Sequence, residues 1–147
     1  MTVGANYEQL PMHCTIMHRF HTEVSAAELK DNLTSIVENS PPITLVPVKH
    51  QAFGPKKQLA TMIQQTPALL ELHTKLYNHL NETGVQYTES DWVGKGYIPH
   101  VTDKHGKRLS HSKPILSRAI YLISVEHPLT GSSRYVEAKI ALDATIS

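Results

Sequence analysis

The apolar residues in the first third of the chain predict one amphipathic helix. Ser25 and Glu28 form the S-x-x-E pattern of a capping box, in which each side chain satisfies a free backbone N–H group at a helix start. The apolar positions that follow recur at helical spacing and would form one buried stripe: Leu29, Leu33, Ile36 and Val37. Proline disrupts a helix interior, so the pattern predicts a helix that begins after Ser25 and ends before the Pro41-Pro42 pair.

A second helix is predicted in the middle of the chain. Thr66 is a favourable N-cap, and Pro67 would occupy the first helical position, where the N–H group that proline lacks has no partner in any case. Gly84 has the position and freedom of a helix-ending C′ residue. The buried face between these signals would consist of Leu69, Leu72, Leu76 and Leu80.

Runs of apolar and β-branched residues predict strands over residues 12–20, 43–53, 57–64, 98–102, 119–125 and 135–142. Pro47 suggests an edge or a bulge in the second of these. The last run alternates, with one apolar face, and the turn at residues 129–133 predicts a hairpin with the run before it. Strands outnumber helices and short turns join several of them, so the pattern favours an antiparallel α+β fold over a doubly wound α/β fold.

The composition is that of one globular unit. The chain has 147 residues, 40% hydrophobic and 18% charged, so residues 1–147 are expected to form a single domain. No apolar run approaches the ~20 residues that span a bilayer, and residues 1–10 lack the features of a signal peptide. The single cysteine, Cys14, excludes an internal disulfide and a cysteine-based zinc site. These features predict a cytoplasmic monomer without membrane association.

The charge balance limits the partners that the chain could bind. The net charge is +1 and the pI is about 7.9, which is too balanced for a protein that coats long nucleic acid by neutralising phosphates. A small nucleotide or one terminal phosphate needs only a few local cations and stays possible. The ten histidines are a surplus of side chains that exchange protons near neutral pH.

Two short motifs, one in each half of the chain, place histidine and threonine two residues apart on predicted strands. They are His13-Cys-Thr15 and His100-Val-Thr102. Side chains at i and i+2 project from the same face of a strand, so each motif would present an imidazole beside a hydroxyl. Two such pairs facing one another would supply a general base, a general acid and hydrogen bonds to phosphate oxygens. The motifs predict phosphodiester cleavage that needs no metal and no other cofactor.

These residues resemble the paired His-x-Thr motifs of the two-histidine (2H) phosphoesterase superfamily, which includes 2′-5′ RNA ligase-like proteins and 2′,3′-cyclic phosphodiesterases. The order of elements over residues 10–142 is also similar, down to Ala52-Phe53-Gly54 at a strand end and Pro99 before the second motif. The resemblance implies a bilobed, pseudo-twofold pair of antiparallel sheets with helices on the outside and a central cleft. It also implies a catalytic set that consists of His13, Thr15, His100 and Thr102.

Further substrate-binding residues are expected near the second motif. Within DWVGKGY at residues 91–97, Trp92 and Tyr97 could stack on a base beside the cation of Lys95. Asp103 stands where the family usually has an aliphatic residue, so the strand is expected to end early. The basic stretch that follows, residues 104–113, could then contact a substrate phosphate, with Lys104 as its first cation.

The sequence leaves two other classes of function open. One is a histidine-rich metal site, for which His13, His18 and His21 would need ligands from elsewhere, and no H-E-x-x-H pattern occurs. The other is a non-catalytic module that binds nucleotide or RNA. Within the enzyme class, the expected substrates are a 2′,3′-cyclic phosphate, a 2′-5′ linkage, an RNA end or a cyclic oligonucleotide.

Overall fold

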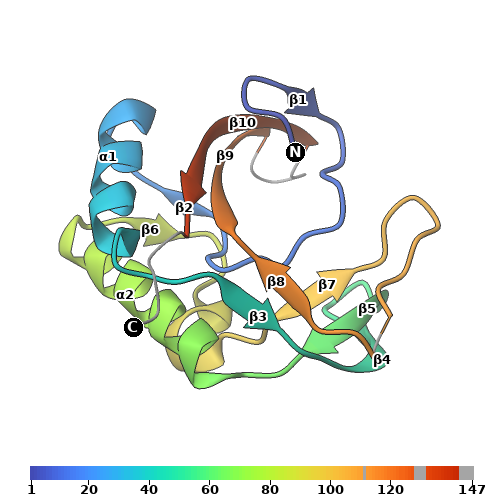
Figure 1. Cartoon of the computed structure of the whole chain (residues 1–147). Helices are drawn as coiled ribbons and strands as arrows, with labels where there is room; N and C mark the ends of the chain where they lie inside the picture. The colour runs from blue at the N-terminus through green and yellow to red at the C-terminus, as the bar shows by residue number, and fades with distance from the viewer. Residues whose placement is uncertain (111, 128–131, 143–147) are drawn as a thin grey trace.

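A computed structural model describes residues 1–110, 112–127 and 132–142 and has a mixed α+β architecture. Two α-helices, α1 (Ala26–Val37) and α2 (Pro67–Glu82), lie on the same side of the molecule, and the described strands form four small antiparallel sheets (Figure 1). The expected α+β class is confirmed. The strands are spread over sheets of two or three strands each, so the implied pair of sheets related by a pseudo-twofold axis stays an expectation.

The two helices begin and end where the sequence predicts. The Ser25 hydroxyl accepts a hydrogen bond from the Glu28 N–H at 3.2 Å, and the Thr66 hydroxyl accepts one from the Leu69 N–H at 3.3 Å. Gly84 follows α2 with a φ of +75°, the left-handed conformation that glycine adopts readily. The apolar stripes face the interior: Leu29, Leu33, Val37, Leu69, Leu72, Leu76 and Leu80 are buried.

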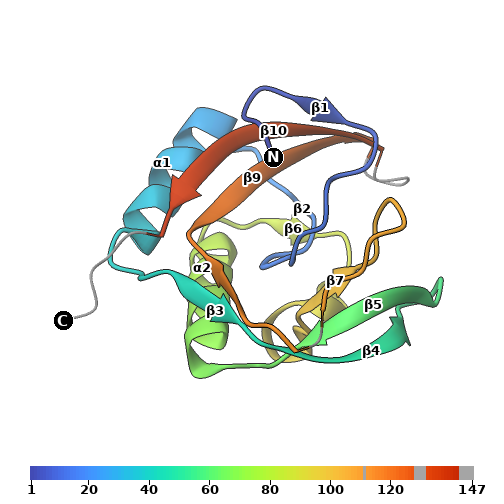
Figure 2. The ribbon, with the colours of Figure 1, turned by 45° about the vertical axis from the view of Figure 1, so that its right-hand side comes forward.

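The hairpin near the C-terminus is also confirmed. Strand β9 (Ala119–His127) pairs with β10 (Ser132–Ala141), and β1 (Asn6–Tyr7) adds to the other edge of β10. The alternating apolar residues of this segment are buried, and β10 packs against α1: Val136, Ala138, Ile140 and Leu142. The expected turn lies mostly outside the described residues. Figure 2 shows β9 and β10 curving together as an arch over the centre of the molecule.

The region predicted as one strand over residues 43–53 forms two strands. β3 (Ile43–Leu45) pairs with β8 (Ile115–Ser117), a strand that the sequence did not reveal, whereas β4 (Pro47–Phe53) pairs with β5 (Gln58–Ile63). The register shifts between Pro47 and Lys49, in agreement with the irregularity expected at Pro47. β5 also pairs with β7 (His100–Thr102), which completes a three-stranded sheet.

The prediction of a continuous strand over residues 12–20 is wrong. This segment pairs at Cys14 through one isolated bridge, and Phe20 belongs to a short strand, β2 (Phe20–His21), that pairs with β6 (Gln86–Tyr87). The apolar residues of the segment that suggested a strand instead pack individually against the core: Met12, Cys14, Ile16, Met17 and Phe20. Burial therefore explains the apolar pattern without a regular ladder.

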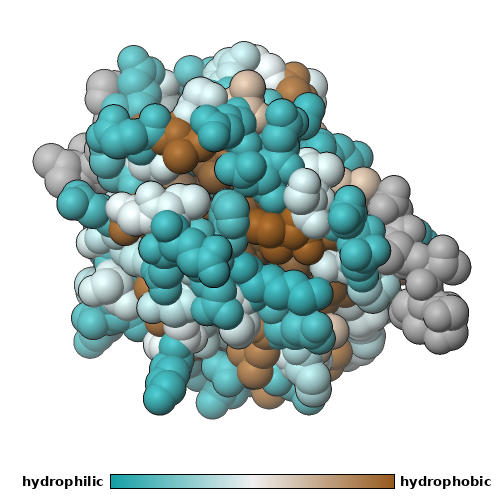
Figure 3. All heavy atoms as spheres, turned by 90° about the vertical axis from the view of Figure 1, so that its left-hand side faces the viewer, coloured by the Kyte–Doolittle hydropathy of each residue, from teal (hydrophilic) through white to brown (hydrophobic). Residues whose placement is uncertain are grey.

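The surface over the helices is mainly hydrophilic, with small apolar patches between polar side chains (Figure 3). In the described part of the chain, no helix has both the length and the apolar character needed to cross a membrane.

Candidate active site

The two His-x-Thr motifs lie side by side. Cys14 forms an antiparallel bridge with Val101, and both residues pack into the hydrophobic core. Residues opposite one another in an antiparallel pair point to the same side, and their chain neighbours point to the other side. The bridge therefore brings the first motif, His13 to Thr15, against the second, His100 to Thr102.

Both motif histidines are held by the same kind of hydrogen bond. Nδ1 of His13 lies 2.7 Å from the carbonyl oxygen of Pro11, and Nδ1 of His100 lies 2.9 Å from that of Ile98. A carbonyl oxygen can only accept, so each Nδ1 carries the proton that it donates. In the neutral ring, Nε2 is then the nitrogen with the free lone pair, and the two carbonyls fix the same tautomer in both motifs.

The surroundings of His13 favour its neutral form. Burial is the largest cause that lowers its pKa below the usual 6.5, and the charges of Lys104, Arg134 and His100 lower it further. The hydrogen bond to Pro11 acts in the opposite direction. His13 therefore favours its neutral form, in which Nε2 can accept a proton.

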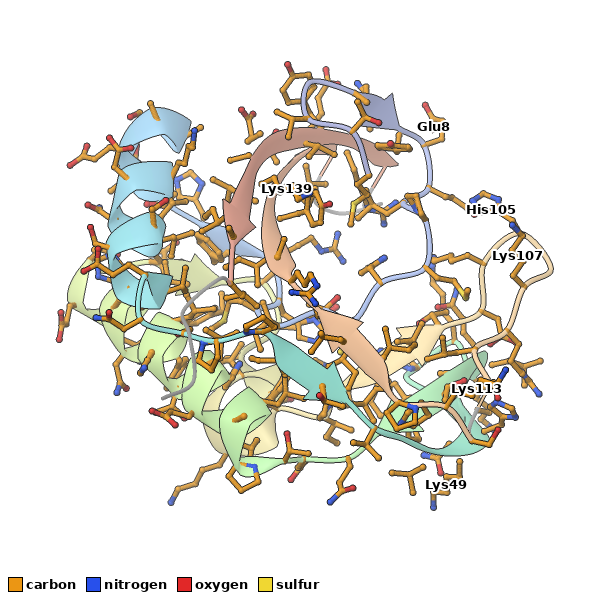
Figure 4. The ribbon with its side chains drawn as sticks, viewed as in Figure 1. Glu8, Lys49, His105, Lys107, Lys113 and Lys139 are labelled. Carbon is orange, nitrogen blue, oxygen red and sulfur yellow. The ribbon has the colours of Figure 1, made fainter. Side chains whose placement is uncertain are left out.

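Lys104, whose charge acts on His13, belongs to a tight hairpin. Lys104 and Lys107 exchange backbone hydrogen bonds around His105 and Gly106, whose φ angles of +54° and +72° fit a two-residue turn. Arg108 donates from Nε to the Asp103 carboxylate at 2.9 Å across the base of the hairpin. Figure 4 shows His105 and Lys107 at the tip, away from the helices. As expected, the strand ends at Thr102.

Arg134 is a cation near His13 for which the sequence gives no signal. Its Nη1 donates to the carbonyl oxygen of Glu8 at 3.0 Å, which ties β10 to the segment that leads into the first motif. Its charge lowers the pKa of Lys104, after the larger effect of burial. Like charges held this close repel one another, and an anion bound between them would relieve the repulsion.

A cavity of about 1340 Å³ opens beside the first motif and beneath the arch of β9 and β10. His13 and Thr15 line it together with Val101, whereas His100 and Thr102 are not among its lining residues. The ring of His100 contacts Phe53 instead. Among the described residues, the charged groups of its lining are one carboxylate and four cations: Glu137, Arg19, Arg118, Arg134 and Lys139. Lys139 lies on the arch itself (Figure 4). This charge balance favours an anionic ligand.

The ring of His100 packs against an aromatic side chain, Phe53. The Phe53 ring lies 4.3 Å from the imidazole of His100 and 5.2 Å from Trp92, measured between ring centroids. Trp92 is half-buried and belongs to the first of two short 3₁₀ turns, η1 (Ser90–Trp92) and η2 (Gly94–Gly96). A Cβ at Gly96 would lie 1.8 Å from the carbonyl oxygen of Asp91, so this turn requires glycine. Trp92 is therefore connected to the second motif through Phe53.

Tyr97 does not have the position expected of a base-stacking residue. It is 1% exposed, its ring stacks on His73 at 4.1 Å, and its hydroxyl donates to the carbonyl oxygen of Thr15 at 2.8 Å. His73 donates from Nδ1 to the carbonyl of Ile16 at 2.7 Å and accepts the Gly94 N–H at Nε2. Tyr97 and His73 therefore support the first motif from the core.

Lys95 and Cys14 contribute less to the site than the residues described above. Lys95 is exposed on its turn. Burial raises the pKa of the Cys14 thiol to about 11, so this residue inside the first motif stays protonated and is a poor nucleophile. Across the described residues, no group of three or more His, Cys, Asp or Glu side chains is arranged to hold a metal ion.

Comparisons with known proteins identify a family for this chain and one curated relative. A model of the 2′-5′ RNA ligase superfamily matches residues 4–131. A protein of Bacillus pumilus (strain SAFR-032), provisionally named a phosphoesterase, is 29% identical over 99 residues. These residues are 66% of this chain and 53% of the relative, so the chain spans about half the length of that curated protein. No solved structure matches the chain.

Proposed function

The chain belongs to the 2′-5′ RNA ligase superfamily, and from this premise we propose that it is a metal-independent phosphodiesterase. Its substrate is the phosphodiester of a nucleotide or RNA end: a 2′,3′-cyclic phosphate, a 2′-5′ linkage or a cyclic oligonucleotide. The observation that supports this proposal is the Cys14–Val101 bridge, which brings the motif of His13 and Thr15 against the motif of His100 and Thr102.

In this proposal, His13 is the general base and His100 the general acid. Burial and nearby positive charge favour a neutral His13, whose Nε2 removes the proton from the attacking hydroxyl or water. Nε2–H of His100 donates a proton to the oxygen that leaves phosphorus. The Thr15 and Thr102 hydroxyls donate to the non-bridging oxygens, and Lys104 and Arg134 offset the charge that develops there.

We also propose that the two motifs are related by a local twofold axis. The antiparallel bridge between Cys14 and Val101 supports this relation, since such a pair is locally symmetric. The equivalent Nδ1 hydrogen bonds of His13 and His100 to the carbonyl two residues earlier support it as well.

A substrate panel tests the proposed activity. Purified protein is incubated with 2′,3′-cyclic mononucleotides, 2′-5′-linked dinucleotides and cyclic oligonucleotides, with and without excess EDTA. We expect hydrolysis of at least one class at a rate that EDTA does not change, because histidines supply both proton transfers. Activity that EDTA abolishes and one divalent ion restores would favour a metal enzyme. Binding without hydrolysis of any substrate would favour a non-catalytic module.

The pH dependence tests the assignment of acid and base. We expect kcat/KM to follow a bell-shaped curve whose acidic midpoint lies below 6.5, because the pKa of the base, His13, is lowered from that value. The alkaline limb should report loss of the proton from the group that acts as the acid. The curve is measured on the best panel substrate in buffers of constant ionic strength. An acidic midpoint above 6.5, or no acidic limb at all, would contradict the assignment of His13 as the base.

A further inference from the structure

The backbone of the first motif has little regular support of its own. In the described part of the chain, residues 12–16 belong to no strand and pair with a neighbouring segment only at Cys14, through the isolated bridge to Val101. A single bridge fixes one point of contact and leaves the flanking residues free to turn about it. The backbone at Thr15 therefore depends on a side chain, the Tyr97 hydroxyl, which donates to its carbonyl oxygen at 2.8 Å.

The Tyr97 hydroxyl is a fixed point in the core. The side chain is 1% exposed, and its ring stacks on His73 at 4.1 Å with planes 4° apart. His73 is in turn held at both ring nitrogens, by the carbonyl oxygen of Ile16 and the N–H of Gly94. The Tyr97 backbone is also fixed, since its N–H donates to the carbonyl oxygen of Gly94 and its carbonyl oxygen accepts from Gln65 Nε2. Neither the ring nor the hydroxyl can move without breaking these contacts.

The same short segment also positions the second histidine. Tyr97 lies three residues before His100, and the carbonyl oxygen of Ile98 between them accepts from Nδ1 of His100 at 2.9 Å. The carbonyl oxygen of Pro99 accepts the Ile63 N–H at 3.0 Å, which anchors the segment to β5. This anchored stretch therefore carries both the hydroxyl that holds the first motif and the imidazole of the second motif.

Cys14 makes a further contact between the motifs. Burial raises the pKa of its thiol, and hydrogen bonding to the Tyr97 hydroxyl and to the His100 backbone acts in the opposite direction. The thiol therefore lies between the hydroxyl and the start of the second motif. Burial also raises the pKa of the Tyr97 hydroxyl, so that it stays protonated and donates to the Thr15 carbonyl throughout the neutral range.

We propose that Tyr97 is a positioning residue whose hydroxyl sets the placement of His13 relative to His100. The bridge at Cys14 and the hydrogen bond to Thr15 are two separate attachments, and two attachments fix the orientation of the first motif where one does not. Phenylalanine would fill the same space, so the hydroxyl is the part of the side chain that carries this role. The inference rests on the proposed function only in taking the two histidines as acid and base.

Tyr97→Phe tests the hydroxyl and keeps the ring. We expect kcat on the best panel substrate to fall roughly 10- to 100-fold, because a small displacement of a catalytic group has an effect of this size. KM should stay within about twofold, since the proton transfers take place only in the transition state. The matched control is Tyr87→Phe, which removes a tyrosine hydroxyl that donates to Asn81 Oδ1 at 3.1 Å. It should keep the parental kcat and KM.

A double-variant cycle separates positioning from a general loss of structure. In the His13→Ala background there is no base left to misplace, and groups that act as one unit are not additive. Adding Tyr97→Phe to this background should therefore change the remaining single-turnover rate by about threefold at most. A general weakening of the structure would instead lower the rate by the same factor in both backgrounds.

NMR titration of the imidazoles gives a second measurement that needs no substrate. Burial is the largest cause that lowers the pKa of His13 below 6.5. A first motif without its hydrogen bond to Tyr97 is less well held against the core, so the pKa of His13 should move towards 6.5 in Tyr97→Phe. Tyr87→Phe should leave this pKa where it is in the parent.

Cys14 supplies the second variant. Cys14→Ala removes the thiol between Tyr97 and His100 and should lower kcat less than Tyr97→Phe, because the hydrogen bond to Thr15 remains. Cys14→Ser keeps a group that can form hydrogen bonds and should restore part of the lost rate. Thermal melting shows which variants are folded. If Tyr97→Phe is not, a loss in Cys14→Ala with recovery in Cys14→Ser supports the positioning role, and parental kcat in Cys14→Ala contradicts it.

The outcomes keep this inference apart from the proposed function. A folded Tyr97→Phe variant with parental kcat, or one that loses the same factor in the His13→Ala background, would overturn the positioning role and leave the proposed function intact. If the parent hydrolyses nothing on the panel, the proposed function fails and the NMR titration decides alone. A pKa of His13 that moves towards 6.5 in Tyr97→Phe then supports the positioning role, and an unchanged pKa overturns it.

Discussion

Replacing His13 or His100 by alanine is expected to lower kcat/KM for the best panel substrate by about 10²–10⁴-fold, the usual effect of removing a group that transfers a proton in the transition state. The two histidines act on the same phosphorus, so the double variant should be hardly slower than either single one. Thr15→Val and Thr102→Val each remove one hydrogen bond to phosphate and should cost less.

The matched control for this experiment is His105→Ala, which removes an exposed histidine at the tip of the hairpin next to the second motif. It should retain the parental rate. Steady-state kinetics on proteins of equal melting temperature make the comparison. Parental activity in both His13→Ala and His100→Ala would mean that the assigned chemistry is wrong and that the motifs serve binding.

The second large effect is expected on stability, from His73→Leu. This side chain is 2% exposed and joins α2 to the carbonyl of Ile16 and the N–H of Gly94. Leucine would leave both backbone groups without the partner that His73 supplies, at a cost of about 1–3 kcal/mol each. We expect the free energy of unfolding to fall by about 2–6 kcal/mol in total, measured by urea denaturation.

His79→Leu provides a control on the same helix. Among the described residues, Nε2 of His79 is buried and has no hydrogen-bond partner. Its removal should therefore leave stability unchanged or raise it. Equal destabilisation by the two variants would show that the hydrogen bonds of His73 are not the source of the effect.

His73 should also make the stability of the protein depend on pH. Burial lowers the pKa of His73 below the usual 6.5, and burial likewise lowers the pKa values of His13 and His18. Below 6.5 the unfolded chain binds protons that the folded chain resists, so stability is lost as the pH falls towards the folded pKa values. Each histidine contributes at most about 1.4 kcal/mol per pH unit in that range. Above 6.5 these groups are neutral in both states and contribute no slope.

The elements that the sequence predicted well are those with local signals. The capping residues Ser25 and Thr66 lie within three residues of the N–H groups they accept from, and the leucine stripe of α2 needs only helical geometry. The hairpin of β9 and β10 follows from alternation in the same way. The strand prediction for residues 12–20 failed because these apolar residues pack individually against the core. They have the composition of a strand but not its regular hydrogen-bond ladder.

The site was predictable only where a motif carries it. The spacing of His-x-Thr identified the candidate histidines and threonines, but the approach of one motif to the other depends on one bridge between residues far apart in the chain. Arg134 has no distinguishing neighbours in the sequence, and its proximity to His13 arises only in the fold. Phe53 was noted only at the end of a strand, and its contact with His100 likewise arises only in the fold. Tyr97 was expected to stack on a base with Trp92, whereas burial against His73 places it in the core.

The support of the first motif has a consequence for synthesis of the chain on the ribosome. The carbonyl oxygens of Thr15 and Ile16 are held by side chains that emerge much later, on Tyr97 and His73. The N-terminal half can therefore leave the exit tunnel and form α1 while its own motif still lacks a fixed backbone. We expect this segment to take its final conformation only after α2 and the turn at Gly94 have been translated. The first motif would then be among the last parts of the molecule to fold.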